Sequence, residues 1–112
     1  MSDDRVFNTG AIRGNNTGKG RFDLISPEGE RRLALRYEHG SVRYGDRSWE
    51  QGIPASSCID SAKRHINQWL SGDDSEDHLS AAAWNLFAIM DYEANNRKMI
   101  DLPKRKKNST RW

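Results

Sequence analysis

The sequence predicts an all-α fold, a small bundle of about three helices with a flexible N-terminal arm and a basic C-terminal tail. Hydrophobic residues recur at helical spacing in three segments, and turn residues rich in glycine, serine and aspartate separate these segments. With 112 residues the chain has room for one domain. Only 35% of the residues are hydrophobic, so we expect a marginal monomer and therefore a homo-oligomer.

The N-terminal part is expected to be a flexible arm over residues 1–20, because it contains four glycines and little to bury. We expect an extended segment at 21–25. Ser26-Pro27-Glu28 then starts the first helix, since a hydroxyl cap, a proline in the first turn and an acid near the helix N-terminus all favour that position. This helix is predicted to run to about His39 and to stop at Gly40.

Residues 40–55 contain three glycines and one proline and are predicted to form a loop. The second helix is expected to begin at Ser56 or Ser57 and to end before Gly72. Its apolar stripe comprises Cys58, Ile59, Ala62, Ile66, Trp69 and Leu70. Ser75 is the expected cap of the third helix, which is apolar nearly all round and should be buried on several sides. The helical domain is thus predicted over residues 21–98, with the tail over 99–112.

The excess of positive charge lies at the C-terminus of the chain. The formal net charge is +2, but five of the 18 basic residues lie in 104–112, which leaves 13 basic against 16 acidic residues elsewhere. This balance argues against a dedicated DNA-binding fold. The tail itself is either a solvated terminus or a segment that binds nucleic acid or an acidic partner.

The chain has one cysteine, Cys58, which excludes a disulfide framework and a Cys-rich zinc site. We see no apolar run of about 18 residues and no basic-then-apolar leader, so we expect no membrane span and a cytoplasmic location.

Polar residues interrupt the apolar faces of the second and third helices. His78 and Asn85 are seven residues apart and point the same way, while His65 lies at the edge of the packed stripe of the second helix. We expect these groups to meet in an interior polar strip, where they must bind one another, water, a metal or a ligand. The alternative is that each histidine is a satisfied core or capping residue.

The segment 44–50 combines aromatic, basic and acidic groups in a predicted loop. Tyr44 and Trp49 can stack on a base while Arg47 binds a phosphate. The alternative is that the two aromatic side chains anchor the loop to the bundle.

Several short motifs follow one another in a specific order. They are Gly20 to Pro27 (GRFDLISP), Tyr37-Glu38, Tyr44 to Gly52 (YGDRSWEQG), Arg64-His65, and His78-Leu79 through Trp84-Asn85. Over about residues 18–93 their order and spacing resemble the phage-type dATP/dGTP diphosphohydrolase N-terminal family, a MazG-like group of all-α nucleotide pyrophosphohydrolases. The resemblance implies hydrolysis of deoxynucleoside triphosphates to monophosphate and pyrophosphate with Mg²⁺ or Mn²⁺, by dimers or tetramers, in the host cytoplasm if the protein is phage-encoded.

Under this hypothesis each candidate residue has a role. Glu38, Asp60 and His78 would be the metal or water-activating groups, and His65, His78 and Asn85 the catalytic groups. Arg21, Arg47 and Arg64 would bind phosphates, with Tyr44 or Trp49 against the base.

Two other functions stay open. The small number of acidic ligands favours a non-catalytic nucleotide-binding or sequestering protein. The basic tail favours a small interaction protein.

Overall fold

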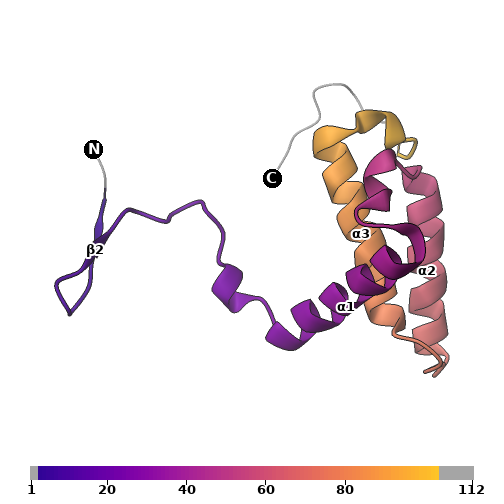
Figure 1. Ribbon diagram of the computed structural model, residues 1–112, viewed down its shortest axis with the longest axis horizontal. Helices are drawn as coiled ribbons and strands as arrows, with labels where there is room; N and C mark the ends of the chain where they lie inside the picture. The colour runs from indigo at the N-terminus through magenta and orange to yellow at the C-terminus, as the bar shows by residue number, and fades with distance from the viewer. Residues whose placement is uncertain (1–2, 104–112) are drawn as a thin grey trace.

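The computed structural model describes residues 3–103, so the basic tail predicted at 104–112 lies outside the described residues. Three helices account for most of this part of the chain, α1 (Pro27–Tyr44), α2 (Ala55–Leu70) and α3 (His78–Asn95). The predicted all-α fold is therefore confirmed. Figure 1 shows α2 and α3 side by side, with α1 crossing them. Within the described range, no helix combines the length and the apolar character needed to cross a membrane.

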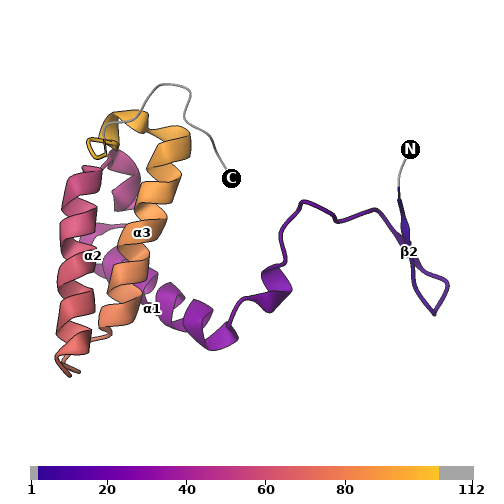
Figure 2. The same cartoon turned by 180° about the vertical axis from the view of Figure 1, so that it is seen from behind.

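The N-terminal arm leads away from the helices, as both faces of the molecule show (Figures 1 and 2). It carries a two-stranded antiparallel hairpin, β1 (Arg5–Val6) and β2 (Ile12–Arg13), whose four residues are all exposed. The extended segment expected at 21–25 is wrong, because a 3₁₀ helix η1 (Phe22–Leu24) occupies it. The ion pair between Arg21 and Asp23, at 2.8 Å, bridges this turn.

Helix α1 starts where the sequence predicted but ends later. The Ser26 hydroxyl accepts a hydrogen bond from the Gly29 amide at 3.0 Å, and Pro27 is the first helical residue. The predicted end at His39 is wrong, because the helix continues through Gly40 to Tyr44. A glycine inside a helix costs only about 1 kcal/mol relative to alanine. Gly45, with φ at +96°, is the residue that ends the helix.

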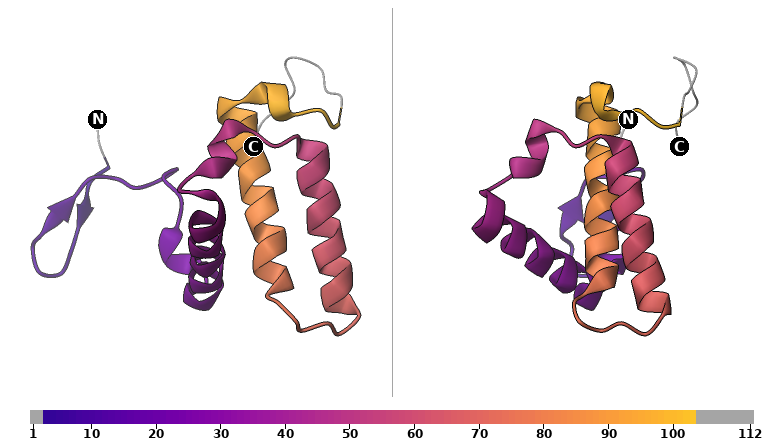
Figure 3. Two further views of the ribbon diagram at one scale, coloured as in Figure 1. Left: turned by 45° about the vertical axis from the view of Figure 1, so that its right-hand side comes forward. Right: turned by 90° about the vertical axis from the view of Figure 1, so that its right-hand side faces the viewer.

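Helices α2 and α3 form the core, and α3 contributes most of its buried residues. These are His78, Ser80, Ala81, Ala82, Asn85, Ala88 and Tyr92, which meet Ala55, Cys58 and Ala62 of α2. Figure 3 shows the two helices as an antiparallel pair connected by a short loop. Most of these buried residues are small, and Tyr92 and His78 are the largest side chains among them.

Of the predicted apolar stripe of α2, only Cys58 and Ala62 are buried. Ile66, Trp69 and Leu70 are exposed, and so are Phe87 and Met90 of α3. The expectation that α3 is buried on several sides is therefore wrong for its outer face within a single chain. The physical reason is that α1 and α2 cover only part of the circumference of α3.

The N-terminal cap of α3 differs from the prediction. Asp77, not Ser75, caps the helix, and its carboxylate accepts from the Ser80 amide at 3.2 Å. The Ser75 amide instead donates to Asp73 at 2.8 Å within the preceding turn. After α3, Met99 and Ile100 pack against the core, so ordered packing continues past residue 98.

Candidate functional site

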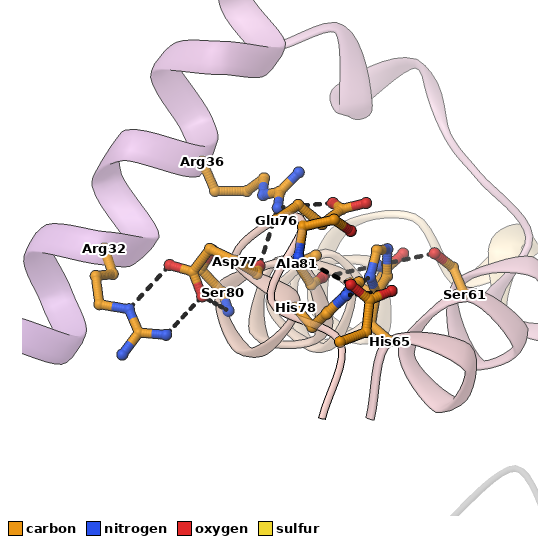
Figure 4. A network of polar contacts seen from close by, with 12 residues as sticks. Arg32, Arg36, Ser61, His65, Glu76, Asp77, His78, Ser80 and Ala81 are labelled. Carbon is orange, nitrogen blue, oxygen red and sulfur yellow. Dashed lines mark hydrogen bonds and ion pairs between the residues drawn. The ribbon is translucent and has the colours of Figure 1, made fainter. Parts of the chain in front are cut away.

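Two arginines attach α1 to the start of α3. Arg32 makes a bidentate contact with the Asp77 carboxylate, at 2.9 and 2.6 Å, and holds the pKa of that carboxyl well below its usual range. One turn later, Arg36 donates to the Asp77 carbonyl at 2.9 Å and to Glu76 at 3.2 Å (Figure 4). None of the α1 residues is buried, so polar contacts carry much of this attachment.

A cavity of about 890 Å³ lies between the C-terminal half of α1, the loop that follows it and the facing sides of α2 and α3. This volume is in the range of small-molecule sites. Three arginines, Arg36, Arg43 and Arg47, line it, against two carboxylates, Glu38 and Asp46. Arg36 and Arg47 are also paired with Glu76 and Glu50 outside the lining, so an anionic ligand would replace these carboxylates as the partner of the arginines.

The two aromatic residues that the sequence placed in a loop have different surroundings, and Tyr44 is the last residue of α1. The Trp49 ring lies 6.4 Å from that of Tyr92, and the Trp49 carbonyl accepts a hydrogen bond from the Tyr92 hydroxyl at 2.5 Å. Tyr44 is 65% exposed and lines the cavity with the Arg43 guanidinium 5.2 Å from its ring centroid. Trp49 therefore anchors the loop, whereas Tyr44 is available to a ligand.

Two histidines meet behind the cavity wall. Nδ1 of His65, which lines the cavity, lies 2.9 Å from Nδ1 of His78, which is 2% exposed (Figure 4). Among the described residues, the buried Nε2 of His78 has no full hydrogen-bond partner, but a carboxylate oxygen of Asp73 lies 3.4 Å away.

The Asp73 carboxylate favours one arrangement of protons on this pair. A carboxylate favours a proton on the nearby Nε2 of His78, which leaves Nδ1 of His78 as an acceptor. His65 then donates its Nδ1–H to that acceptor, and Nε2 of His65 keeps a lone pair. Burial lowers the pKa of His65, so the imidazole is neutral at pH 7.

The structure brings some of the predicted site residues together and leaves others elsewhere. Glu38, Tyr44, Arg47, Trp49, His65 and Asn85 all line the cavity. Asp60 and Arg64 pair with each other at 3.0 Å on the exposed side of α2, and Arg21 pairs with Asp23 on the arm. These three are not among the described residues that line the cavity, so the geometry lends their predicted roles no support.

Asn85 is held by its own helix. Its amide nitrogen donates to the Ala81 carbonyl at 2.9 Å and reaches the Ser61 hydroxyl at 3.4 Å. This pairing explains how an asparagine is accommodated in an apolar helix.

Sequence reasoning gave no role to six residues of this region, which are Arg36, Arg43, Asp46, Asp73, Glu76 and Trp84. Arg36 follows Arg32 by one helical turn, and Glu76 precedes the cap of α3. Two arginines on one helical face opposite a pair of acids are a signal that could have predicted the contact. Trp84 contacts Tyr37, with the ring centroids 6.0 Å apart.

The residues that could hold a metal form two separate groups. Glu38 and Asp46 line the cavity and offer oxygen ligands. Mg²⁺ commonly binds one or two carboxylates together with the phosphates of a substrate, so either side chain suits such an ion, although the Asp46 carboxylate also accepts a hydrogen bond from the Ser41 hydroxyl. The second group, His65, Glu76 and His78, offers two nitrogens and one oxygen within 4.8 Å of one another.

Comparison with known proteins assigns the family. No significant match was found among curated proteins or among solved structures. The family model described as dATP/dGTP diphosphohydrolase, N-terminal, matches residues 9–102. This range includes all three helices and every described residue that lines the cavity. The chain belongs to the dATP/dGTP diphosphohydrolase N-terminal domain family.

Proposed function

We propose that the protein binds a deoxypurine nucleoside triphosphate in the cavity and hydrolyses it to the monophosphate and pyrophosphate. The observation that carries this proposal is that Tyr44, Arg47 and His65 line one cavity of about 890 Å³. Family membership supports the class of reaction and the choice of dATP and dGTP as substrates.

The base and the phosphates would be bound by different walls. Tyr44 offers an exposed aromatic face for stacking on a purine. Arg47 is paired with Glu50 at 3.0 Å, in an exposed ion pair of the kind that contributes little to stability. A phosphate can therefore replace Glu50 as the partner of Arg47, and Arg43 adds a second cation.

The reaction needs a group that accepts a proton from the attacking water. The oxygen of water forms a bond to the α-phosphorus, the bond from that phosphorus to the α–β bridging oxygen breaks, and pyrophosphate leaves. Nε2 of His65 takes the proton in this proposal, because the imidazole is neutral and its Nδ1 is already paired with His78.

Mg²⁺ or Mn²⁺ is the proposed cofactor, with Glu38 and Asp46 as its protein ligands beside the oxygens of the triphosphate. When bound, it supplies neutralisation of the phosphate charge. We propose the cytoplasm as the compartment, or the host cytoplasm if the protein is phage-encoded.

Pyrophosphate release tests the proposal. The untagged protein is incubated with dATP, dGTP, dCTP and dTTP in the presence of Mg²⁺ or Mn²⁺. We expect turnover of the purine nucleotides, and a decrease in kcat of about 10²- to 10⁴-fold for His65→Gln, with nucleotide binding retained. Arg31→Ala, which removes an exposed ion pair with Glu28, is the control and should match the wild type. If the wild type releases no pyrophosphate, the proposal that the protein hydrolyses nucleotides is refuted.

A second function, nucleotide binding without catalysis, is favoured by one observation. Only two carboxylates line the cavity among the described residues, a small ligand set for a hard cation. Calorimetric binding of dATP or dGTP without turnover would support this function. Absence of any nucleotide affinity would refute both proposals.

A further inference from the structure

We propose that His65, His78 and Glu76 form a binding site for one divalent transition-metal ion, with Zn²⁺ as the reference ion. These side chains come from α2, from the first residue of α3 and from the loop between them. One ligand atom from each lies within 4.8 Å of the others. The site is separate from the carboxylates proposed for Mg²⁺, and its metal affinity does not depend on the proposed function.

The spacing of the imidazoles suits a shared metal. Two nitrogens bound to one tetrahedral zinc at about 2.1 Å are about 3.4 Å apart. The two Nδ1 atoms lie 2.9 Å apart, so coordination requires only a small separation of the rings. The Glu76 side chain is 46% exposed and lies in a loop, so it can complete the set without disturbing the core.

The surroundings of these ligands are those of a metal site. A metal-bound histidine usually donates its other ring N–H to a carboxylate or carbonyl. The Asp73 carboxylate is 3.4 Å from Nε2 of His78, and this buried nitrogen lacks a full hydrogen bond to any described residue. Arg36 contacts only one oxygen of Glu76, Oε1, so the other oxygen can coordinate while this ion pair is kept.

The donor set selects the class of ion. Two imidazoles and one carboxylate suit Zn²⁺, Co²⁺ and Ni²⁺, whereas Mg²⁺ and Ca²⁺ prefer oxygen ligands only. Three protein ligands leave a coordination position for water or a ligand oxygen. Metal binding replaces the proton on Nδ1 of His65, which moves to Nε2 of the same ring.

The experiment is a calorimetric titration of the untagged full chain with Zn²⁺ alone, with Co²⁺ absorption as a second readout. We expect one ion per chain and visible Co²⁺ bands on binding. Glu76→Gln should weaken binding by tenfold or more, and Asp73→Asn by about 10- to 100-fold. Both residues lie outside the helices, so these variants are expected to keep the fold, which circular dichroism checks.

Two matched variants serve as controls. Glu28→Gln removes another exposed glutamate that pairs with an arginine, and His39→Gln removes the third histidine of the chain. Both should bind Zn²⁺ like the wild type. Absence of Zn²⁺ binding by the folded wild type, or unchanged affinity in both Glu76→Gln and His65→Gln, would overturn the proposal.

One consequence rests on the proposed function. With metal on Nδ1, His65 presents an N–H at Nε2 instead of a lone pair, so Zn²⁺ should lower kcat in excess Mg²⁺ by about 100-fold or more. Glu76→Gln should resist this inhibition, because it binds Zn²⁺ weakly. A wild type that binds Zn²⁺ but hydrolyses no nucleotide refutes the proposed function alone. A wild type that hydrolyses nucleotide but binds no Zn²⁺ refutes the metal site alone.

Discussion

Asp77 carries two separate contacts, and substitution can remove them one at a time. Its carboxylate caps α3 by accepting from the Ser80 amide, and it also binds Arg32 of α1. Asp77→Ala removes both contacts. Asp77→Ser keeps a hydroxyl that can cap the helix but loses the ion pair with Arg32.

The expected destabilisation follows from the two contacts. Loss of a cap costs about 1 kcal/mol. The Arg32 and Asp77 side chains are 39% and 32% exposed, so solvent screening limits their pair to about 0.5–1 kcal/mol. The free energy of unfolding should therefore decrease by about 1.5–2 kcal/mol in Asp77→Ala and by about 0.5–1 kcal/mol in Asp77→Ser.

Urea unfolding at pH 7, followed by circular dichroism, measures these differences. The Asp77 pKa is lowered on folding, so the ion pair stabilises the protein above the ordinary value of 3.8 and is lost as the pH decreases below it. The difference in the free energy of unfolding between the wild type and Asp77→Ser should therefore become smaller as the pH decreases below 3.8. Equal destabilisation by the alanine and serine variants would refute the separation of cap and ion pair.

Three more perturbations test other parts of the fold. The pKa of His65 is lowered on folding, so the neutral imidazole stabilises the protein above about pH 6.5, and this contribution is lost as the pH falls. The free energy of unfolding, measured at pH 7.5, 6.5 and 5.5, should therefore depend less on pH in His65→Gln than in the wild type. Tyr92→Phe removes the hydroxyl that donates to the Trp49 carbonyl, so the free energy of unfolding in urea should decrease by about 1 kcal/mol. An unchanged urea midpoint would contradict this expectation. Phe87 is 48% exposed, and Met90, three residues later on the same helix, is 53% exposed, so we predict a homo-oligomer that Phe87→Glu dissociates. Light scattering should give a mass above that of one chain for the wild type only.

The sequence predicted features that depend on neighbouring residues. The start of α1 follows from Ser26 and Pro27, and the predicted extent of α2 is within one or two residues of the structure because turn residues bound it on both sides. Helical periodicity also predicted that His65 and His78 lie on facing sides of two helices. Their Nδ1 contact at 2.9 Å agrees with that expectation.

Features that depend on tertiary contacts were not predictable in the same way. Gly40 and Gly45 are equally good stop signals, and the sequence alone does not decide which of them adopts a positive φ. The contact of Arg36 with Glu76 depends on where α1 crosses α3, which no local pattern specifies. The two loop aromatics look alike in the sequence, but only Trp49 has Tyr92 as a neighbour.

The absence of buried residues from α1 has a consequence for how a ligand could enter. A wall that contributes nothing to the apolar core can swing outward while α2 and α3 stay folded together. Its arginines would then exchange carboxylate partners for water, and the contact of Tyr37 with Trp84 would be lost. The site would admit a bulky anion through motion of one of its own walls, and no additional flap would be needed.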